Sequence, residues 1–329
     1  MPFTKNITRS LFSIYRELLL RRFSLFIMLA FHFVWSSSAF SAESDDIAIF
    51  YPDVAEPYKS IYQEIISGAE NAKITDDQNS QLIVFTLEKD FDASRITHQL
   101  NNKGIKKVIV LGRVGLKLAR ALKDDFIVIS GALPITPNTI SGISLITDPK
   151  YLFKYLTLVA PKVDTIHVAY SKANDWLVNL AKSAAMAQGF KLDLRKVDST
   201  KQAIEYYQQL FTRGLSEKDA IWLPIDRVSS QDKVTLPFIL EKAWAEDIVV
   251  FSSKPSHAKR GALFSTYPDN YGLGQQLYKM IHEHNGDIEA KPFSALISTL
   301  LAVNLRTAAH LGFKYSKEQQ KNFQLTFPE

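Results

Sequence analysis

Few residues of this chain have the types and spacing that catalysis requires. Ser256 and Lys259 match the Ser-x-x-Lys pattern of a serine nucleophile with a lysine base, but the Ser-Asp-Asn and Lys-Thr-Gly motifs that accompany that pattern are absent. The chain also lacks a Gly-x-Ser-x-Gly elbow and a phosphate-binding loop. Because a pattern with two fixed positions is common by chance, we expect no enzymatic activity and assign no catalytic residue.

Metal and cofactor motifs are equally sparse. His282 and His284 stand two positions apart on a predicted helix and point in different directions, unlike the i, i+4 pair that a zinc site prefers. Gly272 and Gly274 lack the third glycine of a dinucleotide fingerprint and do not open an early strand-helix unit. With no cysteine, the chain has no disulfide, thiolate ligand or nucleophilic thiol. We therefore expect no metal and no cofactor.

The first forty residues have the composition of an export signal. Arg21 and Arg22 precede the apolar run 23–35, and small residues follow, with Ala39 and Ser41 three and one positions before a cut between Ser41 and Ala42. The apolar run is well short of the roughly 20 residues that a spanning helix needs, which favours a cleaved signal over an uncleaved anchor. The paired arginines are also found in twin-arginine signals, but the long Leu-rich start favours the general secretory route.

Removing residues 1–41 changes the charge of the chain. The segment contains five basic residues and one acidic residue, so the net charge falls from +5 to about +1. The basicity is therefore poor evidence for a nucleic-acid partner, and we expect none. The absence of cysteine excludes a lipid anchor, so we expect a periplasmic protein of about 290 residues, without a membrane tether.

The elements that must position any site alternate between short apolar runs and longer amphipathic runs, which indicates parallel sheets built from strand-helix units. The predicted strands of the first half are 46–51, 81–87, 107–111 and 126–129, and its helices are 58–72, 92–102 and 114–122. Residues 129–165 differ, with glycines and prolines that mark turns and an amphipathic helix over 149–159.

The alternation then restarts. The predicted strands of the second half are 165–169, 191–197, 220–223 and 248–251, and its helices are 175–188, 200–213 and 234–245. The pattern predicts an α/β protein with two doubly wound parallel-sheet lobes. Ligands bind such sheets at the loops beyond the carboxyl ends of the strands, which makes a cleft between the lobes the expected site.

Five segments in this order carry a resemblance to a known family. They are residues 107–112 (KVIVLG), 165–174 (TIHVAYSKAN), 223–226 (LPID), 261–267 (GALFSTY) and 303–312 (VNLRTAAHLG). The chain resembles the ABC transporter substrate-binding proteins of the tryptophan/tyrosine-binding-like family, which have the type I periplasmic-binding fold. The resemblance spans nearly all of the mature chain.

Two loops depart from that family. Residues 52–58 (PDVAEPY) replace an Asn-Pro-Phe-like turn after the first strand, and Ser171-Lys172 replaces an Asn-Pro pair. Because these loops contact ligand in the family, the resemblance implies the fold more firmly than the ligand.

The resemblance also implies how the chain passes between the lobes. The helix 271–283 is expected to cross back to the first lobe and the segment after about Lys291 to return to the second, so that three crossing segments form a hinge. The expected divisions are a signal peptide over 1–41, an N-terminal lobe over 42–148 plus 268–288, and a C-terminal lobe over 149–267 plus 289–329.

Loop position gives the candidate ligand contacts. On the first lobe they are Asp53, Tyr58, Gly112, Arg113, Gly131 and Ala132; on the second they are Tyr170, Asn174, Asp226, Ser253, Lys254 and Tyr267. Arg113 and free backbone N–H groups at a helix start could hold a carboxylate or phosphate, although Arg113 is equally well explained as a surface residue. Asp226 could accept a hydrogen bond from a ligand amine or could cap the next helix.

The sequence thus predicts a periplasmic solute-binding component of an ABC-type uptake system. Its expected partners are a small, amino-acid-like or aromatic ligand and an inner-membrane permease, and we expect a monomer. The alternative is a ligand-loaded partner of a membrane sensor protein, because signalling uses the same cleft and the same closure. A transcription regulator is disfavoured, since the export signal occupies the place of a DNA-binding helix-turn-helix.

Overall fold

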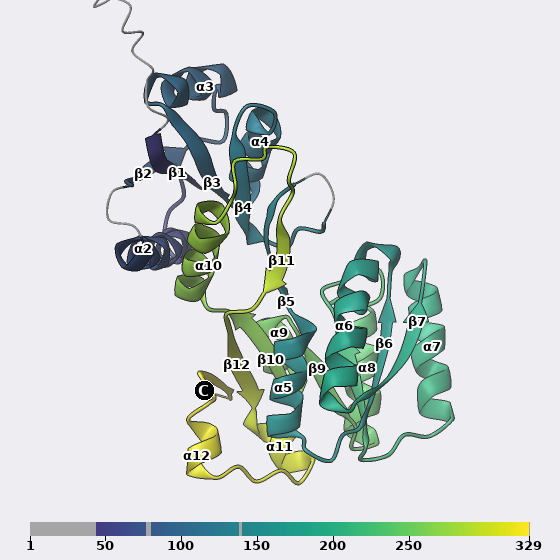
Figure 1. Cartoon of the computed structure of the whole chain (residues 1–329). Helices are drawn as coiled ribbons and strands as arrows, with labels where there is room; N and C mark the ends of the chain where they lie inside the picture. Colours follow the sequence, from purple (N-terminus) through teal and green to yellow (C-terminus); the bar gives the residue numbers. More distant parts are fainter. Residues whose placement is uncertain (1–43, 77–79, 138–139, 329) are drawn as a thin grey trace, which may run out of the picture. The chain divides into compact units, whose positions relative to one another are not determined.

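Five strands from residues 44–147 and one from residues 293–296 form a six-stranded sheet in the order β11-β5-β4-β3-β1-β2 (Figure 1). The pairs β1–β2, β3–β4, β4–β5 and β5–β11 run parallel. The computed structural model describes residues 44–76, 80–137 and 140–328, so the predicted signal peptide lies outside the described residues. The strands are β1 (Ser44–Pro52), β2 (Leu82–Leu87), β3 (Ile105–Leu111), β4 (Ile127–Leu133), β5 (Gly142–Thr147) and β11 (Phe293–Leu296).

Strand β1 shows why this sheet is buried on both faces. Ile47 and Ile49 belong to one apolar cluster, whereas Ala48 and Phe50, which point the other way, belong to a second. Helices α2 (Tyr58–Asp76) and α10 (Asn270–His282) cover the first cluster, and α3 (Ala93–Asn102) and α4 (Gly112–Leu122) cover the second. Each face of the sheet therefore has its own layer of helices.

Helix α10 joins the first lobe through an unusually close approach to α2. A Cβ atom on Gly68 would lie 1.9 Å from the carbonyl oxygen of Tyr271, and one on Gly274 would lie 1.9 Å from that of Ile65. Only glycine permits this backbone contact. Helix α10 therefore packs directly against α2.

The second half forms a seven-stranded sheet in the order β13-β12-β10-β9-β8-β6-β7, in which β12 is antiparallel to β10. Its strands are β6 (Thr165–Tyr170), β7 (Lys191–Lys196), β8 (Asp219–Leu223), β9 (Val249–Ser252), β10 (Phe264–Pro268), β12 (Thr299–Asn304) and β13 (Leu325–Phe327). Its helices are α5 (Pro149–Val159), α6 (Asp175–Gln188), α7 (Thr200–Thr212), α8 (Thr235–Ala245), α9 (Pro255–Arg260), α11 (Leu305–His310) and α12 (Lys317–Gln320), with a short 3-10 turn η1 (Lys172–Asn174).

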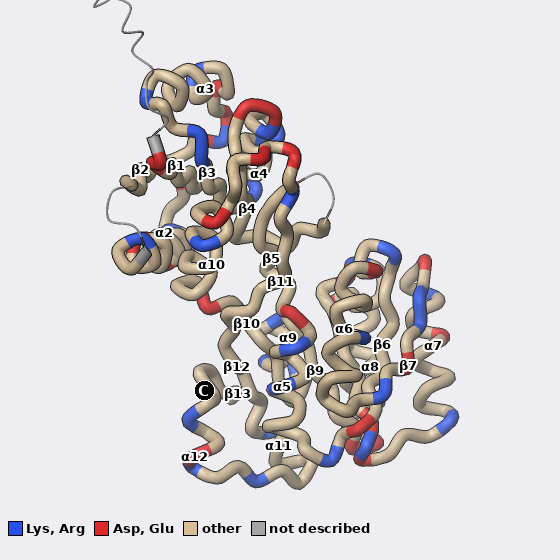
Figure 2. The backbone as a smooth tube through the Cα atoms, viewed as in Figure 1, with Lys and Arg blue, Asp and Glu red and all other residues tan. Residues whose placement is uncertain are grey.

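Helices again cover both faces of this sheet. On β8, Trp222 packs into the cluster beneath α5 and α6, whereas Ile221 and Leu223 pack into the cluster beneath α7 and α8. Acidic and basic residues are interspersed over both lobes (Figure 2), which is typical of a solvated surface. No described helix has the length and apolar character needed to cross a membrane.

The three segments that connect the sheets are hydrogen-bonded to one another. The hydroxyl oxygens of Thr147 and Thr266 lie 2.8 Å apart, and the backbone N–H of Asp148 donates to the carbonyl of Leu296 at 2.9 Å. The backbone N–H of Asp269 likewise donates to the carbonyl of Ser298 at 3.2 Å. This is the arrangement that a three-stranded hinge requires.

The structure differs from the sequence prediction mainly around this hinge. Strand β5 lies within the stretch 129–165, for which the sequence predicts turns and one helix, and β10, β11, β12 and β13 are not among the strands that the sequence predicts. Strand β11 pairs with β5 in the first sheet, and the chain returns to the second sheet only at β12. The expected lobe boundary at 289 therefore assigns residues 293–296 to the wrong lobe. The other lobe divisions remain predictions.

Candidate functional site

The first-lobe candidates follow the carboxyl ends of β1, β3 and β4. Asp53 comes directly after β1 and is exposed, and Tyr58, the first residue of α2, is 64% exposed. Among the described residues, no side-chain hydrogen bond or ion pair orients either side chain. Both remain candidate contacts on position alone.

Gly112 and Arg113 lie where β3 passes directly into α4. Gly112 has a φ of +68°, and a Cβ there would lie 2.4 Å from Oη of Tyr62, whose pKa burial raises. The exposed Arg113 forms no ion pair within the described residues, and neither an acidic residue nor a side-chain cap occupies the start of α4. The amide donors and the guanidinium are therefore free to meet an anion.

Gly131 and Ala132 mainly support the core. A Cβ on Gly131 would lie 2.7 Å from Cδ1 of Leu277 on α10, so this glycine makes room for helix packing. Ala132 has a φ of 60° and packs against the first-lobe core, at a place where the pairing of β4 with β5 changes register. Any ligand contact here would have to come from the backbone.

On the second lobe, Asp226 ties two loops together. It is 7% exposed, and its Oδ2 accepts hydrogen bonds from the backbone N–H of Ser171 at 2.7 Å and from Nδ2 of Asn174 at 2.8 Å. Its Oδ1 accepts from the N–H groups of Val228 at 2.7 Å and Ser229 at 3.1 Å. Burial by itself would raise the pKa of this carboxyl, but these donors lower it below its usual value.

Both carboxylate oxygens of Asp226 therefore accept hydrogen bonds from protein donors. Neither role proposed from the sequence describes this fully: the carboxylate organises its own loop rather than the start of α8, which has no side-chain cap. Asn174 is equally engaged, because its Nδ2 also lies 3.2 Å from the carbonyl of Ile225. Tyr170, at the end of β6, is half-buried beside them and its carbonyl accepts from Val197.

A second network follows β9. The hydroxyl of Ser252 lies 2.8 Å from Nδ1 of His257, and Nε2 of His257 lies 3.0 Å from Oδ1 of Asp232, whose other oxygen pairs with Lys254. The residue types match a catalytic triad, yet Ser252 is 0% exposed and its hydroxyl also bonds the carbonyl of Leu223 and the N–H of Lys254. This row of residues holds the loop between β9 and α9.

Lys254 is thus a candidate contact already paired with Asp232. By contrast, the neighbouring Ser253 is 4% exposed and its hydroxyl has no hydrogen-bond partner within the described residues. At the end of β9, the hydroxyl of Ser252 is therefore fully hydrogen-bonded, whereas that of the next residue, Ser253, is left without a partner among the described residues.

Ser253 belongs to a group of unpartnered polar atoms. The hydroxyls of Ser229 and Ser230 and the indole nitrogen of Trp176 are likewise buried without a partner among the described residues. All four residues lie in segments that follow β6, β8 and β9, three adjacent strands of the second sheet. Within the described residues Ser130, Trp222 and Thr299 also have an unpartnered polar side-chain atom, but all three lie within strands. Such atoms are costly to leave unpaired, so we take the loops at the carboxyl ends of these three strands as the candidate ligand site.

Ser229 and Ser230 are not among the contacts expected from the sequence, although a pair of serines in a loop after a strand was an available signal. Trp176 packs edge-on against Phe293 with ring centroids 5.3 Å apart, so it joins α6 to β11 beside the crossing segments.

Tyr267 lies apart from these groups. It is on β10, where it packs against the small cluster that contains Ala258, Ala302 and Phe327, and burial raises its pKa, with a smaller contribution from Tyr155. Tyr267 lies on a strand that leads into the hinge, and not in the loops that contain Ser229, Ser230 and Ser253.

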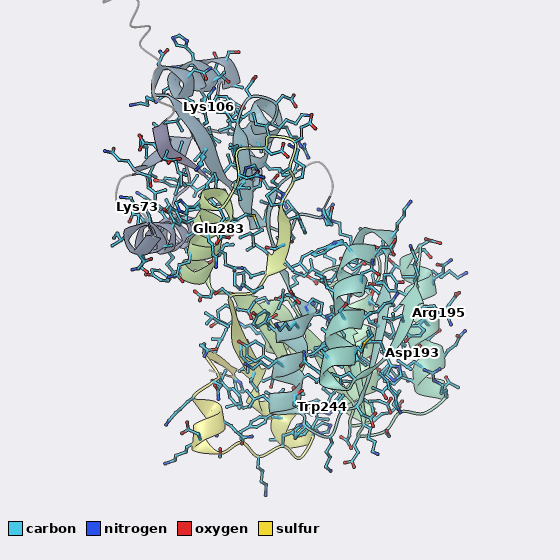
Figure 3. All side chains as sticks on the ribbon, in the orientation of Figure 1. Lys73, Lys106, Asp193, Arg195, Trp244 and Glu283 are labelled. Carbon is cyan, nitrogen blue, oxygen red and sulfur yellow. The ribbon has the colours of Figure 1, made fainter. Side chains whose placement is uncertain are left out.

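A charged cluster that the sequence did not suggest lies on the edge of the second sheet. The ring nitrogens of His167 lie 2.9 Å from Asp193 and 2.6 Å from Asp219, and Arg213 pairs with Asp193 at 2.7 Å. Figure 3 labels Asp193 and Arg195 on strand β7. Within the described residues no group of three or more His, Cys, Asp or Glu side chains is arranged to hold a metal ion. This cluster is a hydrogen-bond network that joins β6, β7 and β8, with an ion pair between Arg213 and Asp193.

Comparison with known proteins rests on structure. No family model matches the sequence, and no curated protein matches it. The ABC domain in complex with L-Trp from Streptococcus pneumonia is 22% identical, with 86% of this chain and 100% of that chain covered and a TM-score of 0.50.

Two further solved structures show the range of the likeness. The ligand-free, open substrate-binding protein with adhesive properties from Clostridium difficile is 16% identical, covers 85% of this chain and 98% of its own, and has a TM-score of 0.57. The transcription regulator CcpA of Lactococcus lactis is 14% identical, covers 78% and 97%, and has a TM-score of 0.41. The chain therefore has the two-lobed type I periplasmic-binding fold, the fold of ABC solute-binding proteins.

Proposed function

We propose that this chain is an exported solute-binding protein that holds a small ligand between its two lobes and delivers it to an ABC-type permease in the inner membrane. The observation that carries the proposal is the set of unpartnered polar atoms of Trp176, Ser229, Ser230 and Ser253 at the carboxyl edge of the second sheet. In a doubly wound fold this edge is where ligands bind. A ligand with hydrogen-bonding groups would satisfy these atoms.

The first lobe contributes a complementary charge. Arg113 stands at the uncapped start of α4, free of ion pairs among the described residues. A carboxylate could accept from its guanidinium and from the backbone N–H groups beside Gly112. We therefore infer that the first lobe binds the anionic end of the ligand.

The second lobe favours neutral polar and aromatic groups. Its buried carboxylate, Asp226, is saturated by protein donors, and Asp232 is paired with Lys254 and His257. What remains there are serine hydroxyls, an indole N–H and the ring of Tyr170. An amino-acid-like or aromatic ligand fits this division, with any ammonium group left to the exposed Asp53 of the first lobe.

The proposal is tested by a thermal-shift screen of the mature chain, residues 42–329, refolded once to remove carried-over ligand. The probes are L-tryptophan, L-tyrosine, other amino acids, nucleosides, sugars and small anions. A ligand at 100 times its dissociation constant stabilises the folded state by about 2.7 kcal/mol, which raises the melting temperature measurably. The proposal requires at least one saturable hit whose affinity falls in Arg113→Gln and Ser253→Ala.

Loss of affinity must be separated from loss of fold. Lys117→Gln is the matched control for Arg113→Gln, because Lys117 is also exposed on α4 and carries one positive charge. A folded wild-type sample that binds none of the probes would contradict solute binding and would favour a protein partner, as in the signalling alternative. Co-purification with a permease supports uptake, whereas co-purification with a membrane sensor supports signalling.

A further inference from the structure

A cavity of about 500 Å³ lies in the second lobe away from the candidate ligand site. Its walls include Trp244 at the end of α8, Gly261 before β10 and Asn304 at the end of β12. Because β12 runs antiparallel to β10, these residues lie at the amino end of β10, whereas Ser253 and Asp226 follow the carboxyl ends of β9 and β8. The volume is within the range of pockets that hold small molecules.

The lining of this cavity is strongly basic. Lys259, Arg260 and Arg306 all line it, and no acidic residue is among the lining residues that the structure describes. None of the three forms an ion pair in the described part of the chain. Nη1 of Arg260 donates a hydrogen bond to the backbone carbonyl of Asp232 at 2.8 Å. Three like charges meet here without a counter-charge.

The cationic wall is held in place by its neighbours. The guanidinium of Arg306 lies over the ring of Trp244, 5.7 Å from its centroid, and that ring stacks on His310 at 3.7 Å and 3°. Nε2 of His310 is in turn 2.9 Å from the carbonyl of Trp244 and 3.0 Å from Asp247. Figure 3 labels Trp244 among the side chains of this lobe. Arg306 is therefore positioned by an aromatic platform.

The remaining walls are rigid and partly apolar. Buried Asn304 donates to the carbonyl of Ala258 at 2.8 Å, and buried Thr307 donates to that of Gly261 at 3.0 Å, which joins α11 to α9. Phe327 is buried at the cavity, and Trp244 is 40% exposed. A ligand here would meet both positive charge and aromatic surface.

We propose that this cavity binds a small organic anion, with its phosphate or carboxylate group held by Lys259, Arg260 and Arg306 and its body against Trp244 and Phe327. Guanidinium groups bind such oxyanions through paired, charge-assisted hydrogen bonds. The site is independent of the interlobe ligand site. Occupancy would offset the mutual repulsion of the three cations and would stabilise the second lobe.

Isothermal titration of the mature chain with inorganic phosphate and with citrate, at low ionic strength, tests this proposal. We expect saturable binding of at least one probe, weakened about tenfold or more in Arg306→Gln and in Lys259→Gln. Lys182→Gln is the control, because Lys182 is exposed on α6 and its loss changes the net charge equally. Each variant must keep the wild-type melting temperature within about two degrees.

Three results would overturn the proposal: no binding of either probe, equal weakening in Lys182→Gln, or binding only to phosphatidylglycerol vesicles. The last result would indicate a membrane-contact surface instead of a small-molecule site. The interlobe proposal is tested separately, because a thermal-shift ligand whose affinity falls in Arg113→Gln should bind Arg306→Gln with wild-type affinity.

Discussion

Nδ2 of Asn174 lies 2.8 Å from Oδ2 of Asp226, and this bond joins the loop after β6 to the loop after β8. The same oxygen accepts the backbone N–H of Ser171, and the other oxygen accepts those of Val228 and Ser229. The pair therefore shapes the rim of the candidate site, and the atoms left for a ligand are its neighbours.

Replacing Asp226 by Ala should destabilise the protein, whether or not ligand is present. Four donors would lose their acceptor in a buried place, and we expect the free energy of unfolding to fall by about 3 kcal/mol. Urea denaturation checks this, with the exposed Asp198→Ala as the control. A fully stable Asp226→Ala variant that has lost only ligand affinity would contradict the structural role.

Ser253 and Ser252 should respond to alanine in opposite directions. Ser253→Ala removes a buried hydroxyl without a partner, so the ligand-free protein should keep or gain up to about 1 kcal/mol while ligand affinity falls. Ser252→Ala should lose about 1–2 kcal/mol, because its hydroxyl bonds His257, Leu223 and Lys254. Melting temperatures without ligand distinguish them, and equal losses would show that Ser253 has a structural partner.

The stability should decrease between about pH 7 and 5 in part because of His257. Burial lowers the pKa of this imidazole, Lys254 and Arg260 add to the effect, and Asp232 opposes it. The unfolded chain therefore takes up a proton below the usual histidine pKa of about 6.5 while the folded chain does not, so stability present at pH 7 is lost as the pH falls. His257→Gln should flatten this part of a urea-midpoint profile, and an unchanged slope would refute the assignment.

Gly112→Ala should destabilise the start of α4. The residue has a φ of +68°, and the new Cβ would lie 2.4 Å from Oη of Tyr62. We expect a loss of about 1–2 kcal/mol from the backbone strain, plus a contribution from the contact with Tyr62. Adding Tyr62→Phe removes the closest atom and should restore part of the loss; no rescue in the double variant would show that backbone strain is the whole effect.

Where local signals are strong, the sequence predicts the fold closely. Helix α5 begins at Pro149 after Asp148, whose side chain accepts from the N–H of Lys150, and α6 ends before Gly189, which has a φ of +79°. Both helices have the bounds that were predicted. The sequence does not predict strand β5, because β5 follows a Gly- and Pro-rich stretch and pairs irregularly with β4.

The candidate site was predicted less well because its chemistry depends on backbone direction. The sequence places Asp226 in the loop after β8, but the N–H groups that saturate it become visible only when that loop and the loop after β6 are folded. For the same reason the sequence cannot distinguish Ser252 from Ser253. The sequence therefore identifies the loops that follow the strands, but it does not identify which side chains in those loops have no hydrogen-bond partner.

The central claim, that a ligand is held between two lobes that close on it, is tested most directly by the distance between the lobes. The chain has no cysteine, so Lys117→Cys on α4 and Lys182→Cys on α6, both exposed, give two unique spin-label positions, one in each lobe. With a saturating concentration of the ligand found in the thermal-shift screen, we predict a shorter and narrower distribution of label distances than without it. The same distribution with and without bound ligand would contradict the claim.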